Sequence, residues 1–101
     1  MNAIAEKLHL LETVVANDAQ LASMLDKVLG AVADQYRQKL AGYCDKLQEM
    51  ERRHGMSTAV FLQRFEAGDL GDGVEWFDWE AFAALKAEAE RKVGELERAG
   101  V

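Results

Sequence analysis

The stretch from Asp18 to His54 constrains this chain most, because it contains no turn signal stronger than a lone glycine. No proline occurs in the 101 residues, so this stretch lacks the residue that disrupts helices most strongly. Its large apolar residues recur at spacings of three or four, close to the helical period of about 3.6. They are Leu21, Leu25, Val28, Val32, Tyr36, Leu40, Tyr43, Leu47 and Met50. This pattern predicts one nearly straight amphipathic helix about 50 Å long.

Residues 2–16 predict a short helix before the long one. One face of this helix would carry Ile4, Leu8, Leu11 and Val15. Asn17-Asp18 then predicts a break followed by a helix N-cap.

The long helix is expected to end at Arg53-His54-Gly55, with basic residues in its last turn and Gly55 in the left-handed conformation. Ser57 is the predicted N-cap of a short corner helix that ends at Gly68. The apolar face of that helix is expected to be Val60, Phe61, Leu62 and Phe65.

Residues 69–73 read as a loop, and a last helix is expected to begin between Val74 and Trp79 and to end near Ala99-Gly100. Its apolar face is expected to carry Phe82, Leu85, Ala89, Val93 and Leu96. The predicted fold is therefore a single all-α domain over residues 1–101. It is a long helical hairpin with a short N-terminal helix and a short corner helix. The apolar surface left uncovered on the first two helices predicts a coiled-coil-like homodimer.

The formal net charge of −6 disfavours binding to phosphate backbones, so no nucleic-acid binding is expected of this chain alone. A basic protein partner fits the charge better. No apolar run approaches the roughly 20 residues that span a bilayer, so no membrane association is expected. Charge already at Glu6 is atypical of a secretory signal, and the single Cys44 cannot form an internal disulfide. These features predict a cytoplasmic, reduced location.

Residues 65–85 contain six acidic side chains and no lysine or arginine. Both tryptophans and three of the four phenylalanines lie in the same segment. Aromatic anchors rimmed by carboxylates are typical of a surface that binds a basic protein. The alternative is that the aromatics fill the corner of the hairpin while the acids cap a helix start. At a helix start Trp76 and Trp79 share one face and Phe77 turns away, so we expect either the tryptophan pair or Phe77 to stay exposed. The predicted partner-binding residues are Phe61, Phe65, Asp69, Asp72, Glu75, Trp76, Phe77 and Trp79.

We expect no catalytic site, metal or cofactor. The acids between Asp69 and Glu75 lack the spacing of a calcium loop, and His9 and His54 have no cysteine pair nearby for zinc. His54 is expected to be a surface residue at a helix end. Cys44 is expected to be a half-buried apolar residue without an activating neighbour.

Several short motifs between about residues 40 and 96 resemble a known group of proteins. They are Arg53-His54-Gly55-Met56-Ser57, then Phe61 and Phe65, then Gly68-Asp69-Leu70-Gly71-Asp72, then Phe77-Asp78-Trp79-Glu80. They resemble small prokaryotic antitoxins of type II toxin–antitoxin pairs, although His54 stands where tyrosine is expected. Residues 1–17 show neither a ribbon-helix-helix nor a helix-turn-helix reader.

The resemblance implies a subunit that neutralises a cognate, basic toxin by direct binding. Two other classes remain open: a structural or adaptor helical hairpin, and an acidic chaperone for secreted effectors. The chaperone fits less well, because such proteins usually contain a sheet and no strand pattern is present. An enzyme fits least.

Overall fold

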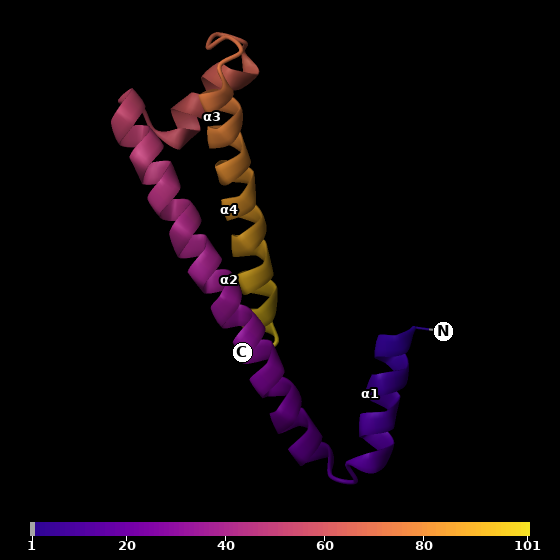
Figure 1. The fold of residues 1–101 in the computed structure, drawn as a ribbon. Coiled ribbons are helices and arrows are strands. Elements are labelled where there is room, and N and C mark those ends of the chain that lie inside the picture. The colour runs from indigo at the N-terminus through magenta and orange to yellow at the C-terminus, as the bar shows by residue number, and fades with distance from the viewer. Residues whose placement is uncertain (1) are drawn as a thin grey trace.

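The computed structural model describes residues 2–101, and within that range the chain is all helical (Figure 1). Its elements are α1 (Ala3–Val14), α2 (Asp18–His54), α3 (Thr58–Glu66) and α4 (Val74–Arg98). The predicted fold class is confirmed, and the helix boundaries agree with the sequence patterns within a few residues. No helix in the described range is long and apolar enough to cross a membrane.

Polar side chains begin three of the helices, and the sequence predicts two of these caps, at Asn17-Asp18 and at Ser57. The side chain of Asn2 accepts from the Ile4 amide at 2.8 Å, and Asn17 accepts from the Gln20 amide at 3.1 Å. Ser57 accepts from the Val60 amide at 3.1 Å. At the end of α2, Gly55 has φ 65° and ψ 29°, the left-handed conformation expected of a glycine cap.

Helix α4 runs antiparallel along the C-terminal part of α2, and α3 bridges the two at the corner where the chain turns (Figure 1). The corner holds the main core, formed by Leu47, Met50, Phe61 and Trp79. Small residues continue the contact away from the corner: Ala33 of α2 and Ala89 of α4 are both buried. The two helices lie closest toward the C-terminal end of α4 and diverge toward the corner, where α3 bridges them (Figure 1).

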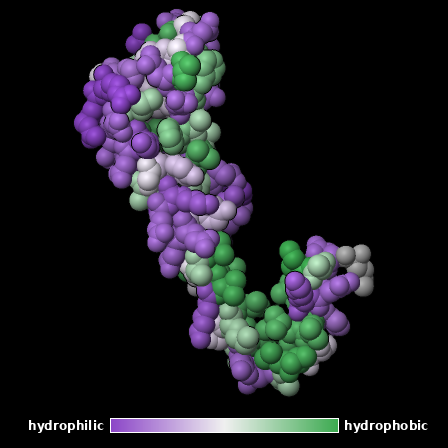
Figure 2. Space-filling model, viewed as in Figure 1, coloured by the Kyte–Doolittle hydropathy of each residue, from purple (hydrophilic) through white to green (hydrophobic). Residues whose placement is uncertain are grey.

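The molecule is elongated, with extents of 61 × 28 × 18 Å and a radius of gyration of 19.8 Å. A compact chain of this length would have a radius of gyration of about 13 Å. The cause is the length of α2, whose N-terminal part extends beyond the end of α4, and α1, which folds back from α2 as an open V (Figure 1). Hydrophobic residues gather around this elbow in Figure 2.

Two predicted core positions turn out to be exposed. Val60 was expected on the apolar face of α3 and Leu85 on that of α4, yet both are among the exposed large apolar residues. Successive helical residues point about 100° apart, so Phe61 takes the inward position in α3 and turns Val60 outward. In α4, Ala89 and Val93 are buried on α2 while Leu85 lies beside this contact.

Candidate protein-binding surface

Stacked aromatic rings from α3 and α4 form the centre of the corner. Phe61 and Trp79 are fully buried, and their rings lie parallel with centroids 4.0 Å apart. The indole N–H of Trp79 donates to the Thr58 hydroxyl at 3.1 Å, which satisfies the one polar atom of the buried ring. Of the predicted partner-binding residues, Phe61 and Trp79 therefore have no side-chain surface to offer and support the corner from within.

His54 joins this cluster from the last turn of α2. Its ring lies 4.7 Å from Trp76 and 5.4 Å from Trp79, measured between centroids. The sequence prediction of a surface histidine is wrong, because the ring is half-buried and its Nε2 is buried without a hydrogen-bond partner. Both tryptophans follow His54 by more than 20 residues, so no local pattern could reveal the contact.

Phe77 is the aromatic side chain that the corner leaves in solvent. Its side chain is 54% exposed, and its ring stands edge-on to Phe65 at 5.4 Å. Phe65 and Trp76 are themselves half-buried. Trp76 and Trp79 share the inner face of α4, so Phe77, about 100° from Trp76 around the helix, is turned away from the core.

Six carboxylates surround Phe77 in sequence, and we call them the acidic corner: Glu66, Asp69, Asp72, Glu75, Asp78 and Glu80. All six residues are exposed. Within residues 2–101 none of them takes part in an ion pair or a side-chain hydrogen bond. Their charge is therefore not neutralised by direct contact with a basic side chain.

Helix capping explains the position of few of these acids. The N-cap of α4 is Gly73, and it has no side-chain hydrogen bond, so Asp72 does not cap the helix. Glu66 is the last residue of α3, where the helix dipole disfavours negative charge. Only Glu75, in the first turn of α4, stands where the dipole favours an acid.

The side of the acidic corner next to α2 is closer to basic residues. Lys46 and Arg53 of α2 line a hollow of about 190 Å³ together with Glu75 and Asp78. Arg53 is bonded to Glu49 at 2.8 Å and forms no ion pair with the corner. The loop acids Asp69 and Asp72 do not line this hollow.

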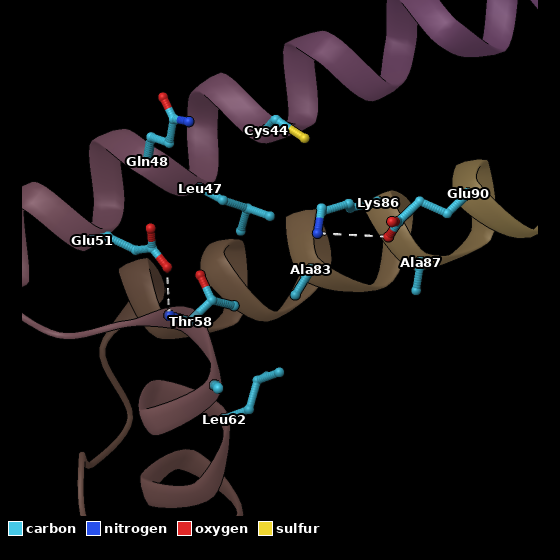
Figure 3. Close-up of a pocket in the computed structure, with 11 residues that line it drawn as sticks. Cys44, Leu47, Gln48, Glu51, Thr58, Leu62, Ala83, Lys86, Ala87 and Glu90 are labelled. Atoms are coloured by element: carbon cyan, nitrogen blue, oxygen red, sulfur yellow. Dashed lines mark hydrogen bonds and ion pairs between the residues drawn. The ribbon is translucent and has the colours of Figure 1, made fainter.

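A groove runs along the other side of the hairpin, where α2, α3 and α4 meet (Figure 3). Its volume is about 470 Å³, and its apolar lining includes Leu47, Leu62 and Ala83. Charged side chains at its edges are already engaged: Glu51 accepts from the Thr58 amide at 2.7 Å, and Lys86 pairs with Glu90 at 3.6 Å. The groove therefore offers an apolar surface rather than a site for chemistry.

Cys44 also lines this groove and is half-buried, as its sequence position predicts. Among the described residues, no group of three or more histidine, cysteine or acidic side chains could hold a metal ion.

Comparisons of the chain with protein-family models, with curated proteins and with solved structures find no match.

Proposed function

We propose that this chain is an antitoxin-like, protein-binding subunit that neutralises a cognate basic toxin by direct contact with the acidic corner. The observation that supports this most is the set of six exposed, unpaired carboxylates around the exposed Phe77. An aromatic anchor with a rim of one charge sign is the arrangement found at strong protein–protein contacts.

The distribution of ion pairs along α4 supports a role for the acidic corner beyond solubility. Every acidic residue in the C-terminal half of α4 is ion-paired: Glu88, Glu90, Glu95 and Glu97. The same helix carries Glu75, Asp78 and Glu80 without any such pair. Unpaired like charges repel one another and destabilise a fold, so a partner that supplies basic groups would relieve that repulsion.

Phe77 supplies the apolar part of the proposed contact. Because the Phe77 ring contacts Phe65, which lies 5.5 Å from the buried Phe61, a partner that covers Phe77 would extend an existing aromatic cluster. The underlying stack of Phe61 and Trp79 keeps this surface rigid, which reduces the entropy lost on binding.

The alternative is a structural or adaptor hairpin without a toxin partner. The complete burial of Phe61 and Trp79 supports it, because these two aromatics serve the corner core. It does not explain the exposure of Phe77 or the position of Glu66 at a helix C-terminus.

Binding to the product of the neighbouring gene tests the proposal. We expect the triple variant Asp69→Ser, Asp72→Ser, Glu75→Ser to associate more slowly and with a flatter salt dependence, because rim charges act mainly on encounter. We expect Phe77→Ala to dissociate faster and to lose about 2 kcal/mol of binding free energy. Surface plasmon resonance at low and high salt measures both effects.

The matched control removes three charges from the other half of the same helix: Glu88→Ser, Glu90→Ser, Glu95→Ser. It changes the net charge equally but leaves the acidic corner intact, so its association rate should change far less than that of the corner variant. If both triple variants slowed association equally, the effect would depend on net charge and not on the acidic corner. Unchanged binding by the corner triple and Phe77→Ala, with helix content intact, would support the structural alternative.

A further inference from the structure

We propose that α1 and residues 18–29 of α2, which we call the arm, form a self-association surface that pairs with the arm of a second copy of this chain. The arm lies at the opposite end of α2 from the acidic corner, so pairing through it leaves that corner free.

Exposed apolar side chains concentrate on the arm. Helix α1 exposes Ile4, Leu8, Leu10 and Val14, and it buries no residue. The adjoining part of α2 exposes Met24, Leu25 and Val28. Among the described residues these are seven of the eleven exposed large apolar side chains, although the arm is only about a quarter of the chain.

The arm is held in shape only near its elbow. Leu21 is buried there, and Leu11 and Val15 are half-buried. Farther from the elbow α1 diverges from α2, so the two helices form an open V whose inner surface is largely hydrophobic (Figures 1 and 2). A short helix with so little packing is marginal in water, since most helical stability in proteins comes from a buried face.

The chain exposes more surface than a compact monomer of its mass. The structure exposes 7226 Å², whereas a compact monomer of 11.2 kDa exposes about 5,700 Å². The excess is about 1,500 Å² per chain, and a standard stable interface buries about 800 Å² per partner. The chain therefore exposes more extra area than one side of a stable homodimer interface requires.

The apolar character of the exposed surface favours a second copy as the occupant. Residues 2–29 carry four acidic and two basic side chains, with seven exposed large apolar side chains among them. The arm therefore suits an equally apolar surface. A two-fold axis supplies such a surface, because it brings the same patch of each copy together.

The V also fits this arrangement in shape. When two arms pair about a two-fold axis, α1 of one copy enters the V of the other. The two α1 helices and the two N-terminal parts of α2 then form a four-helix bundle, in which the stripe of Leu8 and Val28 becomes core.

Light scattering with the full-length chain tests this inference. We expect twice the chain mass of 11.2 kDa at tens of micromolar for the unaltered protein. The double variant Leu8→Glu, Val28→Glu should weaken self-association at least a hundredfold and give the monomer mass, because four carboxylates would enter the bundle core. Its α2–α4 hairpin should remain folded, as judged by the fluorescence of Trp76 and Trp79 at the far corner.

The matched control, Val60→Glu, Val74→Glu, adds the same charge to exposed apolar residues at the other end of the molecule. It should remain dimeric. A monomeric unaltered chain, an arm variant that stays dimeric, or loss of the dimer in both variants would each overturn the inference.

Discussion

Phe61 and Trp79, at the corner where α3 joins the hairpin, are fully buried, whereas Ile4 and Val14 at the other end are 68% and 70% exposed. The corner buries its aromatics within one chain and leaves charges unpaired around them. The arm leaves most of its large apolar side chains uncovered. The corner thus buries its aromatics within one chain, whereas the apolar side chains of the arm would be buried only in the proposed dimer.

Both ends nevertheless come from the same helix. Its stripe of apolar residues runs through all of α2, but α4 covers only the part nearer the corner. Helix α4 is 25 residues long and α2 is 37, so about a third of α2 has no antiparallel neighbour in its own chain. The contrast between the corner and the arm therefore results from the unequal lengths of α2 and α4, which the sequence pattern predicts.

The largest expected effect distinguishes the buried aromatics of the corner from the exposed one. Trp79→Ala should lower the free energy of unfolding by about 3–5 kcal/mol, because it removes a fully buried ring that stacks on Phe61 and bonds to Thr58. Phe77→Ala, at a half-exposed ring on the same helix, should cost less than about 1 kcal/mol. Urea unfolding followed by circular dichroism measures both, and similar costs would contradict a corner core centred on Trp79.

The sequence predicted most of the fold because helix ends depend on local residues. Asn17 and Ser57 cap helices, and Gly55 ends one, through contacts within a few positions. The stacking of His54 on both tryptophans could not be predicted, since it depends on how α3 and α4 meet. The open angle between α1 and α2 could not be predicted either. An apolar stripe indicates that a helix face is to be buried, but not which element buries it.

The candidate site was predictable in composition but only partly in geometry. The spacing of Trp76, Phe77 and Trp79 predicted that one aromatic would face outward, and the structure identifies it as Phe77. Which aromatics form the core was left open, because a helical period assigns residues to a face but not the face to a neighbour. Phe61 and Trp79 take that place through their stacking.

Alanine substitutions at Gly55, in the corner, and at Gly30, where the arm begins, should change the stability of the two regions in opposite directions. Gly55→Ala should destabilise the corner by about 1 kcal/mol, because φ is +65° there. Gly30→Ala, where α2 leaves the hairpin for the arm, should stabilise the helix by up to about 1 kcal/mol. An added Cβ at Gly30 would meet only Val101 at 3.9 Å, an ordinary contact. Thermal unfolding of the two variants should therefore shift in opposite directions, and a shared sign would contradict one of the two backbone assignments.

The smallest expected effect concerns the ion pairs that distinguish the far half of α4 from the acidic corner. The hydrogen bond from Arg91 lowers the pKa of the Glu88 carboxyl below its ordinary value of 4.5, and the positive charges of Arg91 and Lys92 act in the same direction. A pKa that is lower in the folded state means that the ionised carboxylate stabilises the fold. This contribution is fully present above the unfolded pKa near 4.5 and is lost as the pH falls through the lower folded value.

Arg91→Gln should therefore raise the pKa of Glu88 toward 4.5 in a carbon-detected NMR titration and make the unfolding midpoint less sensitive to pH below 4.5. Because the pair is exposed, 1 M salt should produce part of the same shift in the unaltered protein. A Glu88 titration that neither Arg91→Gln nor salt changes would mean that the pairing along α4 is not maintained in solution, and the contrast between paired and unpaired carboxylates on this helix would lose its basis.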